Sequence, residues 1–227
     1  MEALNRPVPA QPSARDDLRT ALARDRVMAI LRYRDGGDLQ RAVDAVVDGG
    51  VRVLEITIDT PGALTAIAAN AGRDGVLIGA GTVSTAEQVD RVADAGAAFV
   101  VSPGFAADVE AAAQRHGLGS LPGVATATEV IVAARAGVEL FKLFPASGLG
   151  RDYLRQIRGP FGDQAFVPTG GVGLDDIPAW LSDGAFAVAL GSSLAGRSAP
   201  ANAADATALT SRAARAVELA RAPRGEA

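Results

Sequence analysis

The chain has 227 residues, of which 48% are hydrophobic, and a formal net charge of −4. This length is enough for one sizeable core and short for two ordinary domains. The sequence has no basic block, no cysteine and no apolar run of about 18 residues, which excludes disulfides and argues against nucleic-acid or membrane partners. We therefore expect a cytoplasmic protein.

The N-terminal segment, residues 1–13, is polar and contains prolines. It lacks the apolar core of a signal peptide, so we expect a disordered lead. Residues 14–25, ARDDLRTALARD, have the apolar spacing of a short amphipathic helix.

From residue 27 onward, short apolar runs alternate with longer segments at helical spacing. The runs expected to form strands are 27–32, 51–58, 75–82, 97–103, 119–124, 138–145, 164–171 and 186–193. The clearest helical segments are 38–50, 85–97, 128–137, 151–161 and 202–221. Successive runs are mostly about 20 to 26 residues apart, which fits strand–helix–strand units. Several helical segments end in glycine, the residue expected at the C′ position.

Eight such units in this length predict a single compact (β/α)₈ TIM barrel over residues 14–222, with a short N-terminal helix. The alternative is a doubly wound open sheet. The sequence has no GxGxxG fingerprint, and this favours the barrel.

Lys142 is the only lysine among 22 lysine and arginine residues, and it lies in the apolar run ELFKLFP. An exposed cation could be arginine here as elsewhere in the chain. Arginine keeps its proton in proteins, whereas a buried lysine can lose it. The uniqueness and the apolar setting therefore indicate a site that needs an amine.

Side-chain alternation places an acid beside this amine. If Leu54 and Ile56 pack under helices, Glu55 points into the barrel, and the same logic turns Lys142 and Phe144 inward. The alternative is a buried structural ion pair, which stabilises proteins poorly.

The one histidine, His116, ends a helical segment, where we expect it to cap carbonyl groups. With a single histidine and no cysteine, we expect no zinc site.

Two glycine-containing loops follow the last two predicted strands. One carries Gly170 and Gly171 in TGG, and the other carries Gly191 and Ser192 in GSS. Glycines let backbone N–H groups approach an anion, and barrels commonly bind phosphate at these loops. We interpret both loops as phosphate-binding, the alternative being ordinary turn glycines.

The sequence resembles the bacterial KDPG/KDPGal/KHG aldolase family, the class I aldolases of 2-keto-3-deoxy-6-phospho sugar acids. The matching motifs cover about residues 20 to 220. They are AILR (29–32), GGVRVLEIT (49–57), IGAGTV (78–83), VSPG (101–104), PGVATATE (122–129), FKLFPAS (141–147), GPFG (159–162), VPTGGV (167–172) and LGSSL (190–194). Each motif is weak alone, but the combination is specific.

The resemblance implies a trimer of (β/α)₈ barrels that needs no metal or organic cofactor. It implies that Lys142 forms the Schiff base and that Glu55 moves protons. Thr82 and Thr169 would contact a phosphorylated keto-acid substrate and pyruvate, and the two glycine loops would hold the phosphate.

One position departs from the family pattern. Some members carry an arginine four residues after the catalytic glutamate, where it holds the substrate carboxylate, and this chain has Asp59 there. Other members carry an arginine at the end of the first strand, as Arg32 does here. We expect Arg32 to supply the cation and Asp59, with Thr60, to cap the following helix.

Two other functions remain open from the residues alone. A sugar-phosphate isomerase or decarboxylase would keep both phosphate loops without an imine. A non-catalytic phosphometabolite-binding barrel would not need the amine of Lys142.

Overall fold

The computed structural model describes residues 14–221. The predicted disordered lead, residues 1–13, lies outside this range, as does residue 222 at the end of the predicted domain. None of the helices in the described part of the chain combines the length and the apolar character needed to cross a membrane.

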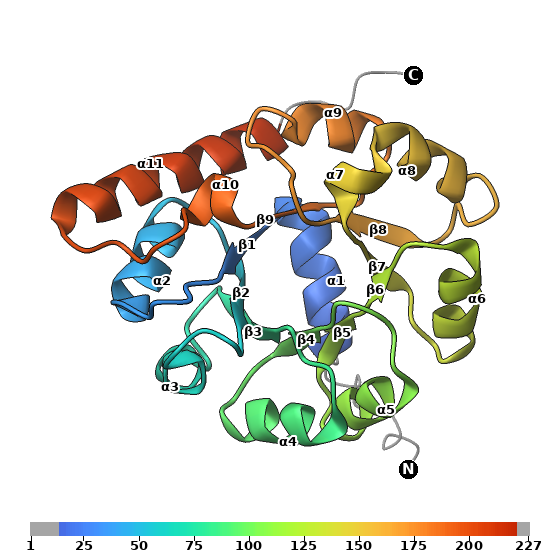
Figure 1. Cartoon of the computed structure of the whole chain (residues 1–227), viewed down its shortest axis with the longest axis horizontal. Helices are drawn as coiled ribbons and strands as arrows, with labels where there is room; N and C mark the ends of the chain where they lie inside the picture. Colours follow the sequence, from blue (N-terminus) through green and yellow to red (C-terminus); the bar gives the residue numbers. More distant parts are fainter. Residues whose placement is uncertain (1–13, 222–227) are drawn as a thin grey trace, which may run out of the picture.

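Helices and strands alternate along the described chain (Figure 1). The strands are β1 (Val27–Leu31), β2 (Val53–Thr57), β3 (Leu77–Gly81), β4 (Phe99–Val101), β5 (Gly119–Leu121), β6 (Gly123–Val124), β7 (Leu140–Leu143), β8 (Ala165–Pro168) and β9 (Val188–Leu190). The helices are α1 (Ala14–Asp25), α2 (Leu39–Asp48), α3 (Ala63–Asn70), α4 (Ala86–Asp94), α5 (Ala107–Arg115), α6 (Ala127–Arg135), α7 (Ala146–Leu149), α8 (Arg151–Arg158), α9 (Ile177–Ser182), α10 (Ser192–Ala195) and α11 (Ala203–Ala220). Every predicted strand run contains a strand, and the predicted N-terminal helix has the predicted limits.

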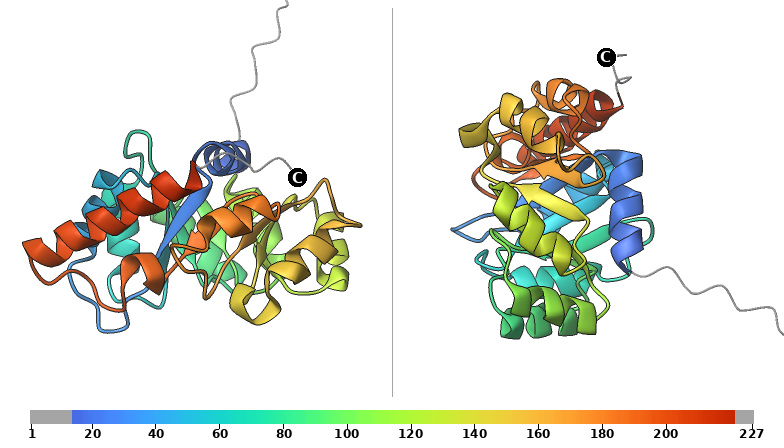
Figure 2. Two further views of the ribbon diagram at one scale, coloured as in Figure 1. Left: turned by 90° about the horizontal axis from the view of Figure 1, so that it is seen from above. Right: turned by 90° about the vertical axis from the view of Figure 1, so that its right-hand side faces the viewer.

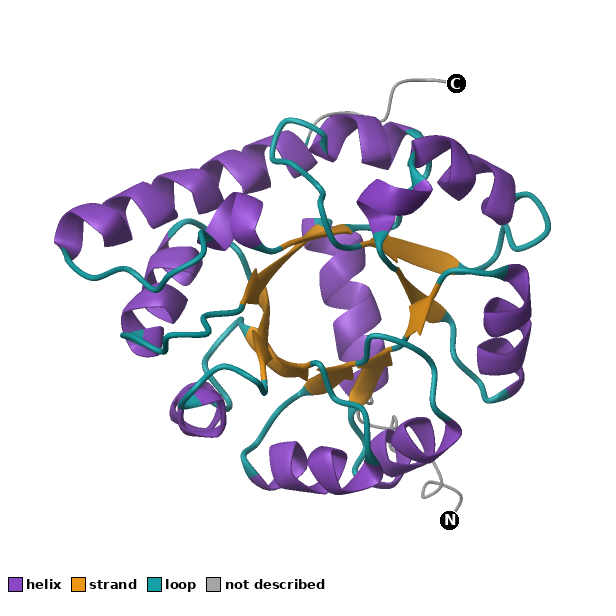
Figure 3. Cartoon of the chain, in the orientation of Figure 1, coloured by secondary structure: helices purple, strands orange, loops and turns teal. Residues whose placement is uncertain are grey.

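The strands pair in parallel and curl around a ring, with most of the helices outside it (Figure 3). They form two sheets, one in the order β5-β4-β3-β2-β1-β9 and the other in the order β6-β7-β8. The α/β class and the curled parallel arrangement are therefore confirmed. The predicted single eight-stranded ladder is not seen as such, because the pairing is divided between two sheets.

The division falls where proline interrupts the fifth predicted strand. Pro122 separates β5 from β6 and has no N–H to donate, so the ladder breaks there. The segment still joins the two sheets, since the carbonyl of Pro122 accepts a hydrogen bond of 2.9 Å from the N–H of Lys142 in β7. At the other junction, Thr169 pairs with Ala189 through an isolated bridge.

Buried side chains fill two layers. The outer layer lies between the strands and the surrounding helices and includes Leu54, Ile56 and Phe141. The inner layer lies within the ring and includes Val53 and Leu140. Alternate residues of β2 and β7 thus face opposite sides, as the period-2 pattern predicts.

Helix α1 covers the end of the ring where the strands begin (Figures 1 and 2). Leu18, Ala21 and Leu22 of this helix belong to the inner layer of the core. The opposite end, where the strands finish, is left to the loops that follow them, so polar side chains at those strand ends meet there.

Candidate active site

Lys142 is buried inside the ring, with 5% of its surface exposed. Its neighbours Phe141 and Leu143 belong to the outer core layer, and Leu140 belongs to the inner layer. The alternation therefore directs Lys142 inward, as predicted. The Nζ atom lies 4.9 Å from the centroid of the Phe144 ring, which follows β7.

Glu55 in β2 enters the same space and is 1% exposed. A glycine on the neighbouring strand makes room for it, because a Cβ atom at Gly81 would collide with the Glu55 carboxylate. Both carboxylate oxygens are buried and accept no hydrogen bond from the residues that the structure describes. A buried polar group without partners is costly, which is typical of a group kept for chemistry rather than for stability.

Burial shifts the pKa values of both groups toward their neutral forms. The pKa of Lys142 is lowered, mainly by desolvation and further by the charge of Arg32, while Glu55 opposes the shift. The pKa of Glu55 is raised, mainly by desolvation and slightly by Asp59, while Lys142 and Arg32 oppose it. The site therefore favours a neutral amine beside a protonated carboxyl group.

This arrangement differs from a structural ion pair. Glu55 and Lys142 interact electrostatically, yet the described residues contain no salt bridge or hydrogen bond between them. A neutral amine is a nucleophile, and a carboxyl group with a raised pKa can donate and accept protons near neutral pH. The pair is thus chemically suited to imine formation.

Arg32 lies directly after β1 at the same end of the ring. Its Nη2 donates a hydrogen bond of 2.6 Å to Oγ1 of Thr82, and its Nε is 3.8 Å from Oδ1 of Asp59. The side chains of Arg32 and Asp59 are each 47% exposed, so this ion pair is strongly screened. Thr82 has a φ of +62°, an unusual conformation for threonine that is often found at functional sites.

The predicted capping role of Asp59 is wrong. Helix α3 has Gly62 as its N-cap and no side-chain capping hydrogen bond. Thr60 instead accepts a hydrogen bond from the backbone N–H of Tyr33 and shares another with Thr57. Asp59 lies before the capping position, which is Gly62, and its carboxylate faces Arg32 instead of the helix.

The two predicted phosphate loops follow β8 and β9. The structure gives φ angles of +88° and +76° to Gly170 and Gly171, which only glycine adopts readily. In the described chain, the backbone N–H groups of Gly171 and Ser192 donate to no protein acceptor. Gly191 precedes Ser192 as the N-cap of α10 and has open space around its Cα. These donors are available to an anion.

Phe144 contacts both the amine and the Gly170 loop, and Thr169 directly precedes that loop. A Cβ atom at Gly170 would approach the Phe144 ring to 2.9 Å, so the ring sits against this loop. Thr169 is buried and its hydroxyl donates a hydrogen bond of 3.1 Å to the carbonyl of Val167. This bond fixes the end of β8 next to Lys142.

His116 lies far from this group and has a different role from the predicted one. It occupies the C-cap of α5, as expected, but its Nε2 is 2.7 Å from Oδ1 of Asp90 on α4. The imidazole of His116 therefore pairs with a carboxylate on the neighbouring helix instead of capping carbonyl groups. Among the side chains that the structure describes, no group of three or more His, Cys, Asp or Glu is arranged to hold a metal ion.

Sequence reasoning missed one contributor to the site, Gly81, and one contact, that of Asp59 with Arg32. Gly81 creates the space for Glu55, and the signal was a glycine inside a strand, which often marks a close approach. Asp59 joins Arg32, and only the fold brings these two loop residues together.

Known proteins match this chain over most of its length. A family model described as KDPG and KHG aldolase matches residues 18–211. The 2-dehydro-3-deoxy-phosphogluconate aldolase of Zymomonas mobilis is 39% identical over 160 residues, which is 69% of this chain and 76% of that protein. The 2-dehydro-3-deoxy-6-phosphogalactonate aldolase of Escherichia coli is 36% identical over 171 residues, covering 74% and 83%.

A solved structure of an aldolase with the same family name is also similar to this chain. The KDPG aldolase of Legionella pneumophila, captured with pyruvate as a covalent carbinolamine, is 30% identical with a TM-score of 0.72. The match covers 90% of this chain and 96% of that one. Together with the match of the family model to most of the sequence, this likeness shows that the chain belongs to the KDPG and KHG aldolase family.

Proposed function

We propose that this chain is a class I aldolase that cleaves a 2-keto-3-deoxy-6-phospho sugar acid, KDPG or KDPGal, to pyruvate and glyceraldehyde 3-phosphate. The observation that carries the proposal is the single lysine, Lys142, buried with a lowered pKa beside the buried Glu55. The names of the relatives and the carbinolamine of the Legionella protein support the same reaction.

The first step forms the imine. The neutral amine of Lys142 attacks the C2 ketone to give a carbinolamine. Burial raises the pKa of Glu55 and so favours its protonated form, which gives its proton to the departing hydroxyl, and water leaves. The product is an iminium ion on Lys142 and a carboxylate on Glu55.

The second step breaks the C3–C4 bond. The Glu55 carboxylate takes the proton of the C4 hydroxyl as the C3–C4 electrons flow into the iminium ion, which leaves an aldehyde and an enamine. Glu55 returns this proton to C3, and water hydrolyses the resulting pyruvate imine. Protons and electrons balance without a metal or an organic cofactor.

The ends of the substrate are assigned to the polar groups around this pair. Arg32 and Thr82 would hold the C1 carboxylate, and Thr169 and Phe144 would line the space around the reacting carbons. The phosphate would lie on the backbone of Gly170 and Gly171 and on Gly191 and Ser192. The unused N–H donors of Gly171 and Ser192 support this assignment.

Borohydride reduction tests the proposal directly. Incubation with pyruvate followed by borohydride should add one reduced pyruvate to the intact chain, and peptide mapping should place it on Lys142. The N-terminal amine is the only other primary amine, so the map has two outcomes. A sugar-phosphate isomerase, a decarboxylase or a non-catalytic binding barrel would give no adduct on Lys142.

Arg32→Ala should lower kcat/KM by about 10- to 150-fold. A charge-assisted hydrogen bond to a carboxylate contributes roughly 1.5–3 kcal/mol, and about 1.4 kcal/mol corresponds to one decade. Because pyruvate carries the same carboxylate, its trapping should weaken too. Steady-state kinetics with the full substrate and trapping with pyruvate measure both effects.

Asp59→Ala serves as the matched variant for Arg32→Ala. The Arg32–Asp59 ion pair is half exposed, and such pairs contribute only about 0–1 kcal/mol, so we expect a change below about fivefold. A harmless Arg32→Ala beside a crippling Asp59→Ala would refute the assignment of the carboxylate to Arg32.

Gly171→Leu should impair cleavage of the phosphorylated substrate at least about tenfold more than cleavage of an unphosphorylated keto acid such as 4-hydroxy-2-oxoglutarate. A side chain at this position collides with Ser147 and covers the backbone donors assigned to the phosphate, which contribute roughly 1.5 kcal/mol or more. Comparing kcat/KM for the two substrates measures the difference.

Gly72→Leu controls for the backbone strain of this substitution. Gly72 also has a positive φ, of +70°, but a Cβ atom there contacts nothing within 4 Å. It should cost stability and leave the ratio of the two substrates unchanged. Equal losses on both substrates in Gly171→Leu would argue against a phosphate loop at Gly171.

The assembly is also part of the proposal. We infer that the two curled sheets act as one eight-stranded barrel over residues 14–222, because hydrogen bonds join them at both junctions. We further infer a cytoplasmic homotrimer. Ile131 and Val132 on α6, the exposed large hydrophobic residues of the described chain, support an interface on that helix.

A further inference from the structure

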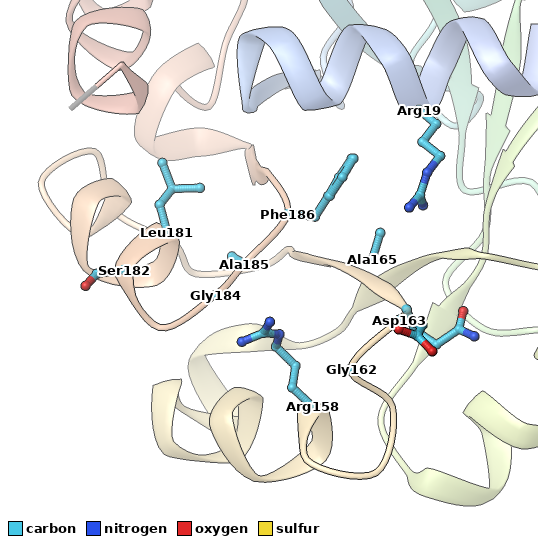
Figure 4. Close-up of a pocket in the computed structure, with 11 residues that line it drawn as sticks. Arg19, Arg158, Gly162, Asp163, Ala165, Leu181, Ser182, Gly184, Ala185 and Phe186 are labelled. Atoms are coloured by element: carbon cyan, nitrogen blue, oxygen red, sulfur yellow. The ribbon is translucent and has the colours of Figure 1, made fainter. Parts of the chain in front are cut away.

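A pocket lies at the opposite end of the strand ring from Lys142. It is about 320 Å³ in volume and is bounded by α1, by the end of α8, and by the segments that lead into β8 and β9 (Figure 4). Its lining includes Ala165, the first residue of β8, and Phe186, which precedes β9. The pocket is therefore separate from the strand ends that carry the candidate active site.

Two guanidinium groups reach this pocket from different helices. Arg19 comes from α1 and Arg158 from the last turn of α8, and Figure 4 shows both side chains directed into the space between the helices. The guanidinium of Arg19 lies 5.1 Å from the centroid of the Phe186 ring. That of Arg158 lies against Gly184, where any Cβ atom would collide with it.

Neither arginine has a carboxylate partner among the side chains that the structure describes, which begin at residue 17. Arg158 makes one long hydrogen bond of 3.4 Å to the carbonyl of Asp183. The other arginines of the same helix behave differently, because Arg151 and Arg155 both form ion pairs with the Asp183 carboxylate. In a chain with more acidic than basic residues, two cations that line one pocket without an ion pair to a described carboxylate are unexpected.

The remaining lining completes a site for a small molecule. Phe186 and Leu181 supply apolar surface, and Gln164 supplies an amide. Nη1 of Arg19 and Oε1 of Gln164 are buried without hydrogen-bond partners in the described structure. An oxygen of a bound anion can accept a hydrogen bond from the unpartnered N–H of Arg19. Rotation of the terminal torsion of Gln164 turns its NH₂ group toward the anion in place of Oε1. Asp163 is the acidic residue of the lining, and it is exposed on the loop before β8.

We propose that this pocket binds a small dianion, a phosphate monoester or a dicarboxylate, held between Arg19 and Arg158 with its carbon skeleton against Phe186. A guanidinium group can bond to two oxygens of a carboxylate or of a phosphoryl group, and convergence of two guanidinium groups favours a double negative charge. The volume suits a metabolite with a short carbon chain. This site is additional to the phosphate loops assigned to the aldol substrate.

Nuclear magnetic resonance of the ¹⁵N-arginine-labelled full chain tests the proposal. Inorganic phosphate and malonate are titrated separately, and the Nε–H signals are assigned with Arg19→Gln and Arg158→Gln. With at least one anion, the signals of Arg19 and Arg158 should move together with one Kd. Saturation by phosphate alone identifies a phosphoryl ligand, and saturation by malonate alone identifies a dicarboxylate. Arg91 is the control, since it is exposed on α4 away from both sites.

The variants separate a shared site from general ion binding. Arg19→Gln should weaken the response of Arg158 by about 10- to 150-fold, because each charge-assisted bond contributes this much. The proposal is overturned if both signals shift no more than that of Arg91, or if Arg19→Gln leaves the Arg158 curve unchanged. The signal of Arg32 reports the candidate active site independently, so either site can fail alone.

Discussion

Lys142→Arg and Lys142→Met should fold and lose aldolase activity by at least about 10⁴-fold, as expected when a covalent nucleophile is removed. Arginine keeps a positive charge opposite Glu55, whereas methionine fills similar space without charge. Neither can form an imine. Circular dichroism and thermal melting would establish folding, and steady-state cleavage with pyruvate trapping would measure the chemistry.

The lowered pKa of Lys142 gives this prediction a pH dependence. Only the deprotonated amine attacks a ketone, so pyruvate trapping should be slow below the pKa and rise to a plateau above it. Because burial lowers this pKa, the midpoint should lie below 10.5, the value of an ordinary lysine. A midpoint near 10.5 would mean that the amine is not desolvated in solution.

Using two variants makes the test of Lys142 decisive. Arginine is larger than lysine and crowds the interior of the ring, which costs stability. The methionine variant therefore keeps the test valid if the arginine variant does not fold. If either variant folds and retains more than about one per cent of the activity, another group performs the covalent step.

Glu55→Gln should lower kcat by about 10²- to 10⁴-fold, the usual contribution of a general acid–base group. Glutamine has nearly the same shape and cannot exchange a proton with the substrate. The exchange of pyruvate methyl protons with deuterated solvent should fall in parallel, because the same group returns the proton to C3. Stability should be kept, since both carboxylate oxygens lack protein partners in the described structure.

Glu110→Gln is the matched control, because Glu110 is the other buried glutamate of the described chain. Its Oε2 accepts a hydrogen bond of 2.6 Å from Ser120, and its Oε1 accepts one of 2.8 Å from Gln114. This variant should lose stability and keep its turnover. A loss of less than about threefold in Glu55→Gln would contradict the proton-shuttle role, since that is far below the expected range.

Local sequence pattern was sufficient for the strands, for α1 and for the inward orientation of Glu55 and Lys142. The limits of α1 and the presence of a strand in every apolar run follow from periodicity, which short-range sterics impose. Alternation in β2 and β7 placed Glu55 and Lys142 on the inner side, because the side-chain period of a strand does not depend on its partners. The retention of one lysine then indicated its chemistry.

Local sequence pattern could not predict the contacts that side chains make with other segments of the chain. Asp59 was expected to cap α3 because it follows β2, but the capping position falls on Gly62 and the carboxylate contacts Arg32. His116 was placed correctly at the end of α5, yet its partner is Asp90 on another helix. In both cases the competing partner lies in a different strand–helix unit, so local preference did not decide the outcome.

The sequence by itself determined the α/β class, the order of elements and the inward-facing amine and acid, because each depends on periodicity within one segment. Only the tertiary structure decided how the sheets join around Pro122, that Gly81 makes room for Glu55, and that Arg19 and Arg158 share a pocket. These features arise where segments distant in the chain pack together, and the geometry of that packing is set by the whole core rather than by any local pattern.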